Sequence, residues 1–153
     1  MQYFVALYTF LVTLIDDHAV AQLALEAYVS RGETSGEPVL EWLAECLSSA
    51  HEHFTPYAVG TIVSATLGFL TTEIFDAEPR TSCMTPWPLN FVDYRRMKSG
   101  MAEAYALFAF DKHRFPDVRA YAHIVPYVQC CTNNCLLTLP ACSDAALFIN
   151  FTK

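Results

Sequence analysis

The sequence predicts an all-α fold, and three observations lead to that prediction. Long uncharged stretches, such as residues 1–15 and 55–72, carry apolar residues at the three- and four-residue spacings of a helix face. No stretch alternates apolar and polar residues as a half-buried strand does. Two loops rich in proline, glycine or charge, 31–38 and 79–88, separate the apolar stretches without marking a domain boundary. We therefore expect about six helices in a single domain over residues 1–153.

The composition limits the classes of function. Hydrophobic residues make up 54% of the chain and charged residues only 16%, below the roughly 25% of an average soluble domain. The net charge is −7, and no basic stripe is present, so we expect no nucleic-acid partner. The first residues lack the pattern of a secretory signal, and the six cysteines show no C-x-x-C spacing. We therefore expect reduced thiols and a cytoplasmic location.

The first two expected helices cover residues 1–17 and 19–29. Apolar residues of the first helix share one broad face, and Leu23, Leu25 and Tyr28 of the second are expected to face the core. The uncharged start is shorter than the roughly 20 residues that cross a bilayer. It is therefore expected to be a buried helix rather than an anchor.

Prolines mark the next two helices. Pro38 suits the first turn of a helix over residues 39–54, and Pro56 that of a helix over 55–72 which closes by residue 78. The uncharged stretch is the best membrane-span candidate in the chain. Its many Thr and Ser residues and the lack of flanking basic or aromatic belts favour a buried helix. We expect no integral membrane segment.

Two further helices are expected near the end of the sequence. One covers residues 89–110, and the other covers 118–131 with an interruption at Pro126.

Two adjacent carboxylates, Asp16 and Asp17, follow the uncharged first helix. Buried carboxylates that lie side by side are costly unless a cation pairs with them. Such oxygens suit Mg2+, which takes one or two carboxylates and fills its octahedron with water and phosphate oxygens. The alternative is a helix end at which both side chains reach water. The pair is our candidate metal site.

A second candidate site lies in residues 93–100, which read DYRRMKSG. Arg95 and Arg96 stand on an otherwise apolar predicted helix, and Gly100 follows at a cost of roughly 1 kcal/mol relative to alanine. The arginine fork matches phosphate oxygens two at a time. The alternative is that both arginines form surface ion pairs, for example with Asp93 or Glu103.

Two other groups are weaker metal candidates. His51 and His53 stand about 200° apart on a helix, which is poor geometry for one ion. The cysteines near Pro126 are irregularly spaced, unlike a zinc site. We expect surface histidines and structural thiols at these positions. The cysteines concerned are Cys130, Cys131 and Cys135.

The apolar helix that ends in Ile-Asp-Asp and the later Tyr-Arg-Arg-Met-x-x-Gly together resemble class I terpene synthases, and among these the fungal trichodiene synthase group. The stretches FTPY, TLGFL and PLNFVDYRRMKSG follow that group's layout, and the resemblance covers residues 4–131. It implies a partial class I terpenoid synthase α-helical bundle, the central part of a longer enzyme whose full-length family members can form homodimers.

The resemblance also implies an activity. The family's sesquiterpene synthases are carbon–oxygen lyases that ionise and cyclise farnesyl diphosphate with Mg2+. Asp16 and Asp17 would hold the metal against the diphosphate. Arg96 would sense the diphosphate, with Ser99 as linker and Gly100 as the carbonyl at a helix break.

Other residues would contact the substrate. Arg95 would assist in binding the diphosphate, and Phe69 would line the cavity that shields the allylic cation, since ring faces offset positive charge. Tyr8 and Phe75 are further lining candidates. Each of these three aromatic residues has a place in an ordinary hydrophobic core as its alternative.

The sequence departs from the family's pattern in two places. A further acidic residue usually follows a turn after the pair, but residues 18–20 read His-Ala-Val. The second metal motif should follow residues 127–131, yet Cys142 replaces its glutamate and Pro140 would break its helix.

We interpret residues 133–153 as an aberrant tail, and we expect little or no catalysis from this truncated chain alone. A non-catalytic helical or membrane-associated protein is the alternative function.

Overall fold

The computed structural model describes residues 1–77, 94–95, 97–98, 101–129 and 131. Within these residues the fold is all-α, without a strand, and the predicted fold class is confirmed. Short helical stretches also occur at 94–95, 97–98 and 125–129. The longer elements are α1 (Gln2–Asp16), α2 (Gln22–Arg31), α3 (Pro38–Ser49), the 3-10 helix η1 (Ala50–Glu52), α4 (Pro56–Ala77), α6 (Ala102–Leu107) and the 3-10 helix η2 (Val118–Ala120).

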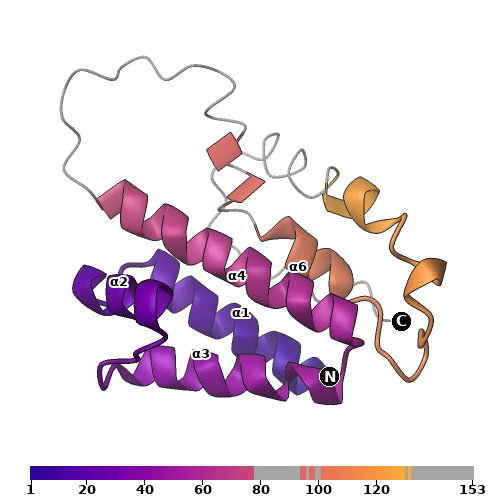
Figure 1. Ribbon diagram of the computed structural model, residues 1–153, viewed down its shortest axis with the longest axis horizontal. Helices are drawn as coiled ribbons and strands as arrows, with labels where there is room; N and C mark the ends of the chain where they lie inside the picture. The colour runs from indigo at the N-terminus through magenta and orange to yellow at the C-terminus, as the bar shows by residue number, and fades with distance from the viewer. Residues whose placement is uncertain (78–93, 96, 99–100, 130, 132–153) are drawn as a thin grey trace.

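Helices α1 and α4 run in the same direction, so their C-terminal ends lie at the same end of the bundle (Figure 1). Helix α3 packs on α1, while α2 and α6 pack on α4. A buried hydrogen bond of 2.6 Å joins the hydroxyls of Tyr8 on α1 and Thr66 on α4. This contact fixes which turn of α1 lies beside which turn of α4.

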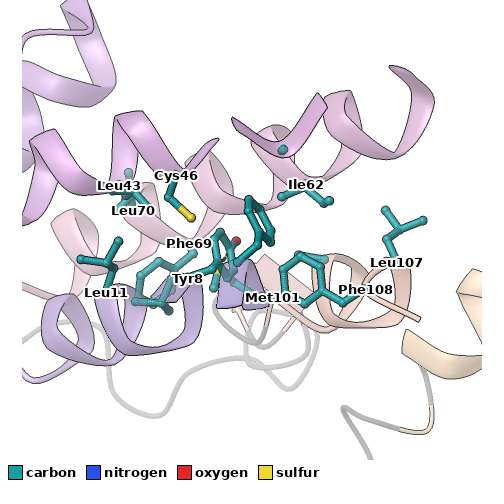
Figure 2. Packing of buried hydrophobic residues seen from close by; sticks show 14 of the residues in the cluster. Tyr8, Leu11, Leu43, Cys46, Ile62, Phe69, Leu70, Met101, Leu107 and Phe108 are labelled. Atoms are coloured by element: carbon teal, nitrogen blue, oxygen red, sulfur yellow. Dashed lines mark hydrogen bonds between the residues drawn. The ribbon is translucent and has the colours of Figure 1, made fainter. Parts of the chain in front are cut away.

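Aromatic side chains fill the space between the helices. Figure 2 shows Tyr8, Phe69 and Phe108 converging from α1, α4 and the end of α6. The ring of Phe4 meets those of Phe54 and Phe108 edge-on, at centroid distances of 5.4 and 5.8 Å. Because each fully buried side chain of this size contributes roughly 1.5–3 kcal/mol, this cluster is the main source of tertiary stability.

A buried thiol lies in the same core. Cys46 of α3 is 3% exposed, and Figure 2 shows it among apolar neighbours. Burial raises the pKa of this thiol to about 11, so it stays protonated.

Helix α4 matches its prediction closely. Pro56 occupies the first turn, where a missing N–H costs nothing. Within the described residues it is the one helix long and apolar enough to cross a membrane. In this structure Ile62, Thr66 and Leu70 of α4 are fully buried against the neighbouring helices. This packing favours a core helix.

The first helical stretch breaks earlier than the pattern predicts. His18 adopts a left-handed backbone, with φ of 58°, so α1 ends and α2 begins only at Gln22. The prediction that Leu23 faces the core is wrong, because its side chain is 79% exposed while Leu25 is buried. Residues two apart lie on nearly opposite faces of a helix.

Three other boundaries also differ from the prediction. The helix expected over 39–54 ends at Ser49 and continues as η1. The helix expected over 89–110 is interrupted at Met101, whose φ is 44°, and α6 follows. In the last expected helix, residues 121–124 form turns, and Pro126 lies in the first turn of the helical stretch 125–129 rather than interrupting a helix.

The Tyr8–Thr66 contact can be tested with Tyr8→Phe. Loss of the hydroxyl should lower the free energy of unfolding by about 0.5–1.5 kcal/mol, because Thr66 keeps its bond to the carbonyl oxygen of Ile62. Urea denaturation followed by circular dichroism measures the change. Tyr3→Phe on the same helix is the matched control, since Tyr3 is 79% exposed. Equal effects of the two substitutions would contradict the assigned role.

Candidate active site

The acidic pair stands at the exposed end of α1. The N–H of Asp17 donates to the carbonyl oxygen of Thr13, and that of His18 donates to Ile15. The left-handed His18 then turns the chain away. Both Asp16 and Asp17 are exposed. Their carboxylates therefore reach water, which is the alternative that the sequence left open, and are available to a ligand.

A buried carboxyl group lies at the same end of the bundle, on α4. Glu73 is only 7% exposed. It lies about two turns beyond Thr66, just as Asp16 lies about two turns beyond Tyr8. Because α1 and α4 are parallel (Figure 1) and the hydroxyls of Tyr8 and Thr66 are bonded, this register places Asp16 and Glu73 at the same end of the bundle.

The electrostatics of Glu73 reflect that place. Burial first, and then the nearby carboxylates of Asp16 and Asp76, raise the pKa of Glu73 from 4.5 to about 7. His18 and Arg95 act in the opposite direction. Within the part of the chain that the structure describes, no group donates a hydrogen bond to Glu73. Because no buried side-chain oxygen among these residues lacks a hydrogen-bond partner, the carboxyl oxygens of Glu73 still reach solvent although most of the residue is covered.

Arg95 forms an ion pair with Asp76, a residue of α4 that lies about one turn after Glu73. Its Nε donates to Oδ1 at 2.9 Å, and its Nη2 donates to Oδ2 of the same carboxylate. This bond, more than any other cause, raises the pKa of the Arg95 guanidinium. Arg95 therefore forms an ion pair, as the alternative to phosphate binding predicted. Its partner is Asp76 rather than Asp93 or Glu103. Its contact with substrate stays a prediction.

A pocket of about 280 Å³ opens beside this ion pair. Phe75, a predicted lining residue, lies on its wall. Lys98 lies across Gly68, where an added Cβ would stand 3.4 Å from the lysine Cδ. The pocket therefore combines an apolar wall with cationic groups. Its lining residues are Gly68, Thr71, Thr72, Phe75, Tyr94, Arg95 and Lys98.

The other predicted site residues fall into two groups. Phe69 and Tyr8 are buried in the hydrophobic core, so their contact with a substrate stays a prediction. Arg96, Ser99 and Gly100 lie outside the described residues. Met101, which follows Gly100 in the sequence, has a left-handed backbone and precedes α6.

The fit of a metal to these residues depends on the ion. Among the described residues no three His, Cys, Asp or Glu side chains form a ready-made metal set. Mg2+ needs only one or two carboxylates when phosphate oxygens complete its shell. The exposed carboxylates of Asp16 and Asp17 fit that requirement. Of the weaker candidates, His51 and Cys131 are exposed.

The sequence pattern missed Glu73 and Asp76. They were interpreted as the closing residues of a helix. A signal for them was present in the sequence. Glu73 and Asp76 are three positions apart and so share one helix face, directly after the uncharged stretch 55–72.

Fungal terpene synthases have amino-acid sequences similar to that of this chain. No family model matches the chain. It is 31% identical to monoterpene synthase 25 of Postia placenta over 127 residues. It is 29% identical to terpene synthase BipA of Cochliobolus sativus over 131 residues, and 28% identical to alpha-cuprenene synthase COP6 of Coprinopsis cinerea over 136 residues. Fungal terpene synthases are therefore relatives of this chain.

The matches cover most of this chain but a minor part of each relative. They include 80–82% of the chain, and 38, 39 and 40% of the three relatives, respectively. The chain thus spans about two fifths of the length of the curated relatives that it matches.

The raised pKa of Glu73 predicts a pH-dependent stability. In metal-free protein, the folded state holds this proton more tightly than the unfolded state, because the pKa rises from 4.5 to about 7. Stability should therefore fall as pH rises from about 5 to 8. Relative to wild type, Glu73→Gln should gain up to about 3 kcal/mol over this range.

Thermal unfolding in EDTA at several pH values measures this difference. Glu41→Gln is the matched control, because Glu41 is exposed on α3 and should show no such trend. A constant difference between wild type and Glu73→Gln at all pH values would show that Glu73 is not buried as described.

Proposed function

We propose that this chain carries the diphosphate-binding, central part of a class I terpene synthase of the trichodiene synthase-like type. The observation that carries the proposal is the meeting of Asp16, Glu73 and the Asp76–Arg95 ion pair at one end of the bundle. The similarity to fungal terpene synthases supports it. The substrate is a prenyl diphosphate, with farnesyl diphosphate as our first choice.

Each group has a chemical task in this proposal. Asp16 and Asp17 hold Mg2+, which when bound offsets the charge that develops on the departing diphosphate. Arg96 donates its fork of N–H groups to the phosphate oxygens. Asp76 of α4 holds Arg95 through its carboxylate.

The apolar surroundings serve the hydrocarbon part. An allylic cation reacts with water unless water is excluded, and aromatic faces offset its charge. Phe75 lies on the pocket wall, and Phe69 is buried on the same helix, α4. We propose that they line the prenyl chain.

The proposal predicts metal-dependent binding of inorganic diphosphate to the chain. Isothermal titration with MgCl2 and diphosphate should give a measurable signal for the wild type, and Asp16→Asn should weaken it by at least about tenfold. Asp117→Asn is the control, since Asp117 pairs with Arg119 in η2, away from the site. No binding to the wild type, or equal binding to both variants, would contradict the proposal.

Turnover is a separate question. Incubation with farnesyl or geranyl diphosphate and Mg2+, followed by gas chromatography of volatile products, should give little or no hydrocarbon. The reason is that the second metal motif is missing from these 153 residues. Abundant product would contradict that expectation and would also identify the preferred prenyl length.

A further inference from the structure

We propose that Lys98 is a diphosphate-binding residue of the pocket beside the Asp76–Arg95 ion pair. This inference rests on the proposed function and assigns a further residue to the same site. The sequence predicts Arg95 as the residue that assists Arg96 in binding the diphosphate. Arg95 and Lys98 both line the pocket, but they differ in what they already bind, and that difference favours Lys98.

The guanidinium of Arg95 is occupied. Its Nε and Nη2 donate to the two carboxylate oxygens of Asp76. Such a two-point contact matches the planar fork of the arginine to a single carboxylate. Arg95 would have to release Asp76 before the same edge of its fork could bind a phosphate. Its positive charge is therefore already offset within the protein.

The ammonium of Lys98 lies over α4 at Gly68. A Cβ placed on Gly68 would stand 3.4 Å from Cδ and 3.8 Å from Nζ of the lysine. An alanine methyl would still fit there, but a larger side chain on α4 would take the place of the lysine stem. Within the described ranges, Lys98 forms neither an ion pair nor a hydrogen bond.

The other side chains of the pocket make the ammonium stand out. The hydroxyls of Thr71 and Thr72 donate to backbone carbonyl oxygens one turn earlier in α4, at 2.7 and 3.0 Å. Phe75 adds an apolar wall. Apolar surroundings lower the local dielectric constant and so strengthen the attraction between an ammonium group and a phosphate oxygen. Lys98 is therefore the donor that best suits an anionic ligand here.

Glu103 is the protein group that could compete for this ammonium. Lys98 and Glu103 line a neighbouring pocket of about 240 Å³, which also includes Gly68. The two side chains form no ion pair in the structure. If they paired transiently, the pair would hold Lys98 away from the ligand. The Glu103→Gln variant should therefore bind diphosphate at least as tightly as the wild type.

The test measures the affinity of Lys98→Met for inorganic diphosphate in MgCl2 by isothermal titration. Methionine keeps an unbranched stem over Gly68 and removes the charge, so the melting temperature should stay unchanged. The affinity should fall by about tenfold. The loss should become smaller at high salt, because screening weakens the contribution of the ammonium in the wild type.

Two further variants make the result specific. Arg114→Met removes one positive charge from an exposed side chain in the turn after α6 and should leave the affinity unchanged. Lys98→Arg keeps the charge and should retain most of the affinity. An unchanged affinity in Lys98→Met overturns the inference. So does an equal loss in Lys98→Met and Arg114→Met, which would reflect net charge alone.

The Asp16→Asn variant separates this inference from the proposed function. If the wild type binds no diphosphate with Mg2+, or if Asp16→Asn binds it equally well, the proposed function fails and this inference fails with it. If Asp16→Asn loses binding while Lys98→Met keeps it, the function stands and Lys98 is only a surface residue.

Discussion

The candidate site depends on the register of α1 against α4, which the buried Tyr8–Thr66 hydrogen bond fixes. The helices contribute acidic residues that are more than fifty positions apart in the sequence. A shift by one residue would rotate each helix face by about 100° and separate Asp16 from Glu73. Aromatic packing around Tyr8 and Phe108, with ring centroids 5.1 Å apart, supports the same alignment.

Much of the fold could be predicted from the sequence because helix periodicity is local. Helix α4 and the all-α class follow from apolar spacing and from Pro56. The break at His18 could not be predicted in this way, because the residue is not the glycine that usually adopts a left-handed backbone at the end of a helix. The prediction that Leu23 faces the core failed because α2 is short and has few apolar residues. Such a helix can turn more than one of its faces toward the core.

The candidate site was predictable only in part. Adjacent aspartates and adjacent arginines are visible as motifs, so the sequence alone predicts Asp16 and Arg95 as candidate site residues. The partner of Arg95 is nineteen positions away, at Asp76, and no local pattern links them. Glu73 was missed because charge at a helix end is usually solvated, whereas here the bundle covers it. Tertiary contacts determine both outcomes.

The buried thiol of Cys46 has a practical consequence. A protonated thiol inside the core reacts with an alkylating reagent only after α3 has moved away from α1, so its modification rate reports how often this helix layer opens. Exposed Cys131 would react first and provides an internal reference in the same sample. The alkylation rate of Cys46 therefore measures how often α3 separates from α1. It does not depend on whether a ligand is bound near Asp16.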